Sequence, residues 1–350
     1  MKAAEHSVDL VVPGLLGPVP ESVAQSPGAA IGRPALERFL SRGRRFADHQ
    51  FDPVGLLADR FDTQGRPVAA GPVGLRGVGG EPGGGFWYRV DAVHLRPDRD
   101  RLLVFGPAAV GVTAGECEAV AEACNRLLAE DDLRLVPARD HWYLAVGTVP
   151  DVAMHSIYRV SGHYMDDHLP SGADARRWNA LLTELQMLLH GLGLNAEREA
   201  RGLPTLNGLW PWGGGVVPGR CVNRYDHLYA DHPVAKGLAE LAGGEAAALP
   251  DGWPADTRGG QVGVFDTRPL DALTSGDAQA WLDAVDRFEA GWLAPLLQAL
   301  ERGGLDRLRL FTGCGRRWTG DRWALRRFWR RRGGFRHWLE GAAGPGEGDQ

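Results

Sequence analysis

Residues 8–18 read VDLVVPGLLGP, an apolar run that ends at a proline and a glycine. Valine and leucine in this density are typical of a strand, and the Pro-Gly pair predicts a turn directly after it. Further strands are expected at residues 261–265 and 308–311, with helices over 232–241 and 277–300. Strands that alternate with helices indicate an α/β protein with a doubly wound parallel sheet.

A segment with a different order of strands and helices interrupts this pattern. Strands are expected at residues 86–95, 101–105, 133–136 and 142–146. A helix over 113–130 begins at a capping box made by Thr113 and Glu116, and another helix covers 171–190. This order predicts a small inserted α+β cap. We therefore expect four parts: 1–85, the N-terminal part of the core; 86–203, the cap; 204–338, the C-terminal part of the core with a terminal helix; and 339–350, a disordered tail.

Two glycine-rich stretches border the cap. Residues 62–85 are rich in Gly and Pro and lack helical periodicity, so a loop or linker is expected there. Residues 206–210 are expected to form a strand of the core that ends in the glycine-rich turn 212–215.

Composition excludes several classes of protein. With 350 residues, 44% hydrophobic and 24% charged, the chain is neither disordered nor fibrous. Its net charge of −5 gives no global attraction to nucleic acid or membrane. No run reaches the roughly 18 apolar residues of a membrane span, and the N-terminus is a poor signal peptide. The four cysteines form no CxxC pair. A cytoplasmic protein without disulfides is expected.

Two polar clusters allow a metal or catalytic interpretation. His163 and Asp167 could share one helical face, but Pro170 follows and favours a polar lead-in to the next helix. Asp231 and His232 precede a proline-led helix, a position typical of an N-cap. The sequence has no GxSxG, HExxH or phosphate-loop motif.

Arginine and tryptophan alternate near the C-terminus. Residues 316–338 hold nine arginines and four tryptophans with one acidic residue, Asp321. Such a composition is typical of proteins that bind single-stranded nucleic acid, because guanidinium groups contact the phosphates and indoles stack on the bases. The alternative, which we favour from sequence, is an amphipathic terminal helix that buries Trp323, Phe328 and Trp329. Nucleic acid is accordingly an unlikely partner at this point.

Several segments resemble a known family. Residues 195–207, NAEREARGLPTLN, look like the N-x-E-R-x-x-x-G-L-P-x-A-N stretch of the archaeal-type cofactor-independent phosphoglycerate mutases. Residues 230–238 resemble their next core helix, and residues 88–91 their entry into the insertion. The PGLLGP start, the NGLWPWGGG turn and the Arg/Trp tail are similar to RpfE-type bacterial regulatory proteins. The resemblance implies an alkaline-phosphatase-like core with an inserted cap.

The resemblance also implies two metal ions held by Asp and His, and a serine nucleophile. Where the family's first strand ends in Asp-Gly, this chain has Pro13 and Gly14. The family's Asp-Glu-x-Gly-His becomes residues 270–274, with only Asp271 kept, and its Thr-Gly-Asp-His becomes residues 312–315 around Cys314. No Gly-Ser-Asp motif lies between residues 31 and 85. These losses predict a dismantled metal site.

We therefore expect a catalytically degenerate, regulatory or ligand-sensing protein without catalytic residues, metal or cofactor. It would bind an anionic small molecule in the crevice between core and cap, or a regulatory protein partner, and no membrane. The expected ligand-binding residues are Arg89, Asp91, Trp210, Trp212, Gly213 and Gly214. The alternative is a metal-dependent phosphoryl-transfer enzyme with substitute residues, for which the candidates are His227, Asp231, His232 and Cys314. A second alternative is nucleic-acid binding through the tail.

Overall fold

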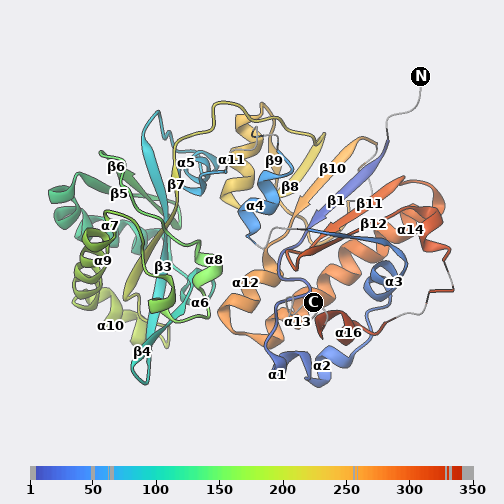
Figure 1. Cartoon of the computed structure of the whole chain (residues 1–350), viewed down its shortest axis with the longest axis horizontal. Helices are drawn as coiled ribbons and strands as arrows, with labels where there is room; N and C mark the ends of the chain where they lie inside the picture. Colours follow the sequence, from blue (N-terminus) through green and yellow to red (C-terminus); the bar gives the residue numbers. More distant parts are fainter. Residues whose placement is uncertain are drawn as a thin grey trace.

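The computed structural model describes residues 5–48, 52–61, 63, 67–254, 257, 259–327, 329–330 and 333–340. Within these residues the strands form one sheet of seven strands and one of five. The two sheets lie side by side along the long axis of the molecule, with helices packed around each (Figure 1).

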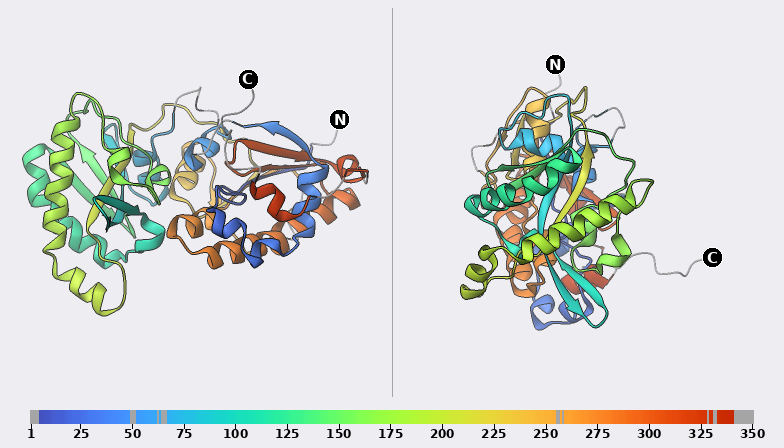
Figure 2. Two further views of the ribbon diagram at one scale, coloured as in Figure 1. Left: turned by 60° about the horizontal axis from the view of Figure 1, so that its bottom comes forward. Right: turned by 90° about the vertical axis from the view of Figure 1, so that its left-hand side faces the viewer.

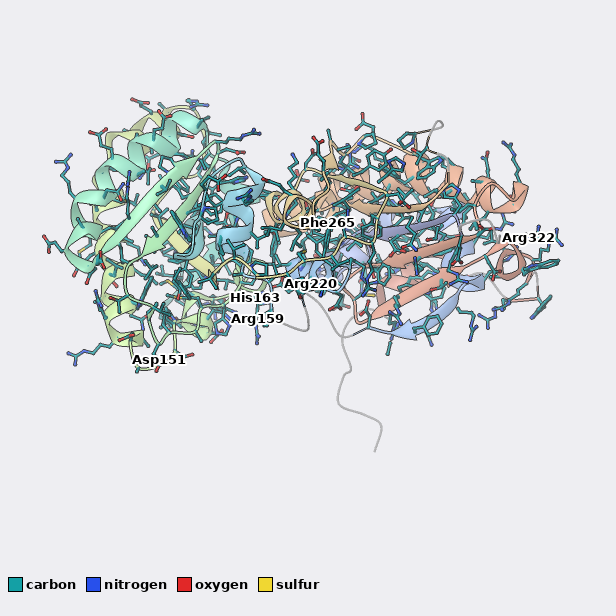
Figure 3. The ribbon with its side chains drawn as sticks, turned by 90° about the horizontal axis from the view of Figure 1, so that it is seen from above. Asp151, Arg159, His163, Arg220, Phe265 and Arg322 are labelled. Carbon is teal, nitrogen blue, oxygen red and sulfur yellow. The ribbon has the colours of Figure 1, made fainter. Side chains whose placement is uncertain are left out.

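The main sheet is built around β1, the strand predicted from residues 8–18. β1 pairs in parallel with β10 on one side and with β11 on the other, whereas β12 and β2 add antiparallel strands at one edge. The spatial order is β2 (Arg44–Ala47), β12 (Arg316–Gly320), β11 (Arg307–Phe311), β1 (Ser7–Val11), β10 (Gln261–Phe265), β8 (His227–Ala230) and β9 (Ala246–Ala247). Phe265, the last residue of β10, lies at the middle of the long axis (Figure 3), so the carboxyl ends of the parallel strands face the second sheet.

Helices cover one face of the main sheet and bury its largest core (Figure 2). They are α3 (Pro34–Arg42), α13 (Ala278–Phe288) and α14 (Ala294–Arg302), and α13 and α14 are joined by a π-helical turn, Glu289–Leu293. Trp281 and Trp292 are fully buried between these helices and the strands. This amphipathic packing buries apolar surface and so stabilises the sheet.

The second sheet is antiparallel and is covered by two long helices. Its strands are β3 (Phe86–Asp98), β4 (Arg101–Phe105), β5 (Leu133–Ala138), β6 (His141–Val146) and β7 (Gly208–Gly215). α7 (Ala114–Leu128) and α9 (Ala175–His190) lie over it, and Thr113 and Glu116 form the predicted capping box. Short helices fill connections: α1 (Glu21–Ala24), α2 (Pro27–Ala30), α4 (Pro53–Ala58), α6 (Pro107–Val110), α8 (Ile157–Val160), α10 (Gly193–Ala200), α11 (Pro233–Leu241) and α12 (Arg268–Ser275), with 3₁₀ turns at Ala129–Asp131 and Met165–His168.

The expectation for residues 206–215 was wrong. These residues form no strand of the main sheet, because β7 (Gly208–Gly215) pairs antiparallel with β3, with a register shift between Trp212 and Gly215. The apolar pattern predicted a strand correctly, but its partner strand lies more than a hundred residues earlier and left no local signal.

The expected linker at residues 62–85 was also wrong, because it contains the buried helix α5 (Ala70–Gly77). α5 packs against α11, and the glycines permit this contact: a Cβ on Gly77 would lie 1.9 Å from the Pro233 carbonyl oxygen, and one on Gly237 would lie 1.9 Å from that of Val73. Here glycine serves close helix packing rather than a loop.

The C-terminal segment differs from the expected amphipathic helix. Residues 316–320 form the strand β12, followed by short helices α15 (Arg322–Leu325) and α16 (Phe335–Glu340). Trp318 is buried, but Trp323 is 60% and Trp329 is 69% exposed, so these two rings do not pack inward. Phe328 lies outside the described residues, as do residues 341–350 of the expected disordered tail, whereas residues 339 and 340 end α16.

Among the described residues, none of the helices combines the length and apolar character that crossing a membrane requires.

Candidate functional site: a crevice between the two sheets

A crevice of about 610 Å³ lies between the carboxyl edge of the main sheet and the second sheet. In folds of this kind, ligands bind outside the carboxyl ends of the parallel strands. The main sheet contributes side chains from the segments that follow β8 and β10, and the second sheet contributes β3, β6 and α8. The polar residues that line it include Arg89, Asp91, Asp140, His141, Tyr158, Asp231, His232, Thr267 and Asp271.

The buried cation of the crevice is Arg89. Its Nε and Nη2 donate to the Asp91 carboxylate at 3.1–3.2 Å, and Asp91 Oδ2 also accepts from the Trp212 indole N–H at 2.6 Å. Arg89 and Asp91 are two positions apart on β3, so their side chains share one face of the sheet. Nη1 of Arg89 is buried and has no partner among the described residues. One N–H edge of the guanidinium is therefore left without a hydrogen-bond acceptor among the described residues.

His232 is neutral and its tautomer is determined by its neighbours. Nδ1 accepts the backbone N–H of Val234 as the N-cap of α11, so the ring proton lies on Nε2. Nε2 lies 2.8 Å from the Tyr158 hydroxyl oxygen and donates to it. Burial, reinforced by the charge of Arg89, holds the pKa of His232 well below its usual value. The Tyr158 hydroxyl oxygen accepts the hydrogen bond from His232 Nε2, so its own O–H can donate to another acceptor.

Two other titratable groups have shifted pKa values. Burial raises the pKa of Asp271 to about 6, against the opposing effect of the hydrogen bond from Thr267 Oγ1 at 2.9 Å. Burial and the Arg89 charge lower the pKa of His141 to about 4. At neutral pH the crevice therefore presents one buried guanidinium, two neutral imidazoles and several carboxylates.

The serine and threonine hydroxyl groups that line the crevice already have acceptors. Ser161 donates to the Ile157 carbonyl, Thr274 to the Leu270 carbonyl and Ser275 to the Ala272 carbonyl. Thr267 donates to the Asp271 carboxylate instead. The first three therefore lack the neighbouring base that an activated nucleophile needs.

The carboxyl edge does not supply the ligands that the resemblance implies for two metal ions. Asp266, the first residue after β10, is 2% exposed and is paired with Arg268. After β11, Thr312 Oγ1 donates to Cys314 Sγ at 3.0 Å, and after β1 the chain continues into Pro13. Across the described parts of the chain, no three His, Cys, Asp or Glu side chains are grouped so that they could hold a metal ion. The residues present do not fit the family's metal pair.

The structure brings four of the predicted residues to the crevice and leaves others elsewhere. Arg89, Asp91, Asp231 and His232 line it. His227 begins β8 and so lies at the opposite end of that strand. Three further predicted residues do not line the crevice: Cys314, Trp210 and Gly214. The Trp210 indole donates to the His155 carbonyl at 2.8 Å, and Gly214 packs against the Tyr88 ring.

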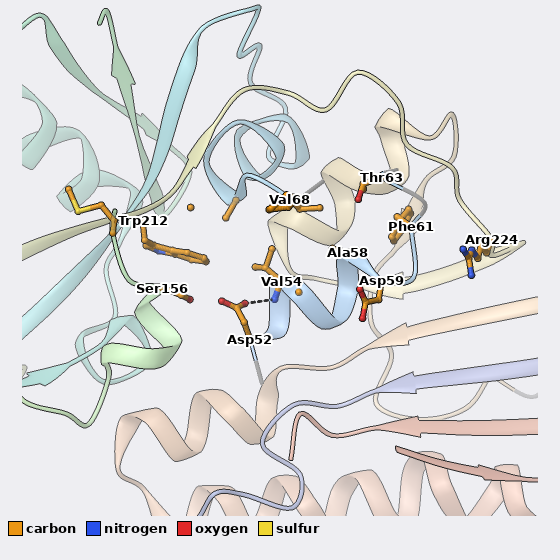
Figure 4. Close-up of a pocket in the computed structure, with 15 residues that line it drawn as sticks. Asp52, Val54, Ala58, Asp59, Phe61, Thr63, Val68, Ser156, Trp212 and Arg224 are labelled. Atoms are coloured by element: carbon orange, nitrogen blue, oxygen red, sulfur yellow. Dashed lines mark hydrogen bonds between the residues drawn. The ribbon is translucent and has the colours of Figure 1, made fainter. Parts of the chain in front are cut away.

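Trp212 and Gly213 line a second pocket of about 680 Å³ beside the crevice. Figure 4 shows it between α4 and the second sheet, with Asp52 Oδ1 accepting the Val54 N–H as the N-cap of α4. Because the Trp212 indole also bonds Asp91, this ring connects the two cavities.

The stretch 195–207 that carries the family resemblance has a structural role. Arg198 is 1% exposed, and its guanidinium bonds the Glu116 carboxylate at 2.8 Å and the carbonyls of Val110 and Pro204. The Asn195 amide bonds both backbone groups of Leu206. These contacts hold α10 and the start of β7 in place, and none of residues 195–207 lines the crevice.

Sequence reasoning missed His141 and Tyr158 as crevice residues. Each belongs to a short element whose local sequence resembles any half-buried strand or turn, and they meet the main sheet only through the fold. Asp271 was noted only as a remnant of a motif, and nothing in the sequence indicated its burial.

Comparisons with known proteins agree with the fold. No family model matches the chain. It is 22% identical over 326 residues to a probable 2,3-bisphosphoglycerate-independent phosphoglycerate mutase of Geobacter sulfurreducens, spanning 83% of this chain and 81% of that protein. It is 23% identical over 218 residues to a 2,3-bisphosphoglycerate-independent phosphoglycerate mutase of Methanothrix thermoacetophila, spanning 55% and 54%.

Among solved structures, the chain resembles the PH0037 protein from Pyrococcus horikoshii with a TM-score of 0.50 and 12% identity, covering 91% of this chain and 88% of that one. A cofactor-independent phosphoglycerate mutase from Thermoplasma acidophilum gives a TM-score of 0.42 with 18% identity, covering 90% and 89%. The expected α/β class, with a main sheet and a second antiparallel sheet, is confirmed. The chain is a distant homologue of the archaeal-type cofactor-independent phosphoglycerate mutases.

Proposed function

We propose that this chain is a catalytically degenerate phosphoglycerate-mutase-like protein of the RpfE-type regulatory kind. It binds a small hydroxylated carboxylic acid in the crevice and does not turn it over. The observation that carries the proposal is the buried guanidinium of Arg89, whose Nη1 has no partner among the described residues. A buried donor of this kind is costly unless a ligand or water satisfies it.

The other groups in the crevice define the chemistry of the ligand. A carboxylate on the ligand pairs with Arg89 and accepts the spare Tyr158 proton. Asp231 and Asp271 then accept hydrogen bonds from ligand hydroxyl groups. The same carboxylates repel a ligand of high negative charge, so a monoanion is favoured over a phosphorylated one.

Loss of catalysis is supported by the arginine at the carboxyl edge. Arg268 satisfies the Asp266 carboxylate with its own positive charge, and the Cys314 pKa is raised by burial, which disfavours its thiolate. A regulatory role is supported by the position of the crevice, because a ligand that bonds Arg89 and Asp231 joins the two sheets.

Isothermal titration calorimetry with glycerate and 3-phosphoglycerate tests this function, since the two probes differ by one phosphoryl group. We expect glycerate to bind more tightly. Tyr158→Phe should weaken its binding about 2- to 12-fold, the effect of one hydrogen bond. Tyr164→Phe is the matched control, because the Tyr164 hydroxyl bonds Asp98 outside the crevice.

The proposal fails if glycerate does not bind at millimolar concentration, if Tyr158→Phe and Tyr164→Phe bind it alike, or if 3-phosphoglycerate is converted to its isomer.

A further inference from the structure

The exposed aromatic rings gather at one end of the molecule. Among the described Phe, Tyr and Trp residues, only Phe46, Trp323 and Trp329 are exposed, by 37%, 60% and 69%. Phe46 lies on β2, the edge strand, which is exposed at every position. Large exposed rings are costly in a monomeric protein, so their clustering at one place indicates an interaction surface.

Guanidinium groups lie over these rings. The Arg44 and Arg317 guanidinium carbons are 5.6 and 5.4 Å from the centre of the Phe46 ring, and Arg317 is the cross-strand partner of Phe46. Those of Arg322 and Arg326 are 4.9 and 4.8 Å from the Trp323 ring. Each of these two rings therefore has two positive charges close to it.

The two clusters are parts of one surface. Arg330 Nη1 donates to the Gly43 carbonyl, directly before Arg44. A groove of about 450 Å³ lies beside Arg44 and is lined by Arg44, Arg45, Arg330 and Trp338 among others, and α15 with Trp323 follows directly after β12, the strand that pairs with β2. Arg322 lies at the end of the molecule farthest from the second sheet, and no helix crosses β12 and β2 in this view (Figure 3). The surface is thus separate from the crevice.

The positive charge of this surface is not neutralised within the chain. Arg44, Arg45, Arg317, Arg322, Arg326 and Arg330 have no carboxylate partner in the part of the chain that the structure describes. By contrast, Arg38, Arg101 and Arg177 elsewhere are ion-paired. Since the whole chain carries a net charge of −5, this unpaired positive charge is a local feature.

We propose that this arginine–aromatic surface, formed by Arg44, Phe46, Arg317, Trp323, Arg326 and Arg330, binds single-stranded nucleic acid. Arginines contact the phosphates, and the exposed rings stack on unpaired bases. A duplex hides its base faces, and an acidic polypeptide has none, so neither uses the rings. The proposal replaces the expectation that Trp323 and Trp329 are core residues.

Fluorescence anisotropy with the full chain and labelled 12-nucleotide oligo-dT and oligo-U tests it. We expect binding of at least one probe that falls with salt, and DNA and RNA are distinguished by comparing the two. The variant Phe46→Ala with Trp323→Ala should weaken binding about five- to 150-fold for each stacked base lost. Arg44→Gln with Arg317→Gln should reduce the slope of log K against log salt by about 1.4.

The double variant Arg176→Gln with Arg201→Gln is the matched control. It removes two exposed arginines that lie on α9 and directly after α10, outside the arginine–aromatic surface. It should leave binding unchanged, and melting curves should show that all variants fold. The proposal is overturned if neither oligonucleotide binds at low salt, or if the aromatic variant binds like the wild type. It is also overturned if a duplex, heparin or poly-glutamate binds as tightly as the single strand.

Discussion

Asp266 accepts three hydrogen bonds from Arg268. The guanidinium Nε and the backbone N–H donate to Oδ1 at 2.8 and 3.0 Å, and Nη2 donates to Oδ2 at 2.7 Å. Asp266 is buried at the carboxyl end of β10, at the edge where the resemblance implies metal ligands. A side chain of the protein itself supplies the cation that this carboxylate requires.

Replacing Arg268 should therefore destabilise the protein. Arg268→Gln leaves the buried Asp266 carboxylate with only its backbone partner and should cost about 2–4 kcal/mol in the free energy of unfolding. Asp266→Asn combined with Arg268→Gln should recover part of this loss, as urea denaturation would show. Equal losses in the single and double variants would mean that the pair is not coupled.

The raised pKa of Asp271 should make stability fall as pH rises. Its folded-state pKa of about 6 exceeds the unfolded value near 3.8, so the native state holds the proton more tightly between these values. The loss of stability caused by ionising the buried Asp271 is absent below about pH 4 and complete above about pH 6, where it reaches on the order of 2–3 kcal/mol. Asp271→Asn should equal the wild type at pH 4 and exceed it in stability at pH 7.5. Parallel pH profiles of the melting temperature would contradict this.

Close helix packing at Gly77 gives a prediction with an internal control. Gly77→Ala places a Cβ against the backbone of α11 and should cost about 1–3 kcal/mol. Gly84→Ala meets no atom within 4 Å, and its change should stay within about 0.5 kcal/mol. Similar midpoints for the two variants in urea would show that α5 is not packed on α11.

Two tryptophans of the C-terminal segment should behave in opposite ways. Trp318 is buried in the main core beside Trp338, so Trp318→Ala should cost about 3–5 kcal/mol. Trp323 is mostly exposed, and Trp323→Ala should change stability by less than about 1 kcal/mol. Differential scanning calorimetry of both variants decides this, and a large loss for Trp323→Ala would refute the surface position of its ring.

The parts predicted correctly from sequence are those with strong local patterns. The apolar runs around Val8 and Val262 became neighbouring parallel strands, and the Thr113–Glu116 capping box begins α7 as expected. The proline-led helix after His232 was also predicted, with His232 itself rather than Asp231 as its N-cap.

The errors arose where tertiary contacts override local composition. The glycines of α5 indicate a loop by composition, yet they serve helix contact with Gly237. A cavity lies between the two sheets, where the sequence predicted a crevice, and Arg89 and Asp91 line it. Their role in ligand binding stays a prediction. Tyr158 and His141 were not predicted, because their roles depend on the partner that the fold brings to them.

The most direct test of the central claim is an assay of 3-phosphoglycerate isomerisation by ³¹P nuclear magnetic resonance. The folded, full-length protein would be supplied in turn with Mn²⁺, Mg²⁺ and Zn²⁺, and an active mutase would serve as positive control. We predict no turnover with any ion, because Pro13, residues 270–274 and Cys314 stand where the resemblance implies metal ligands. Turnover that a chelator abolishes would contradict the account.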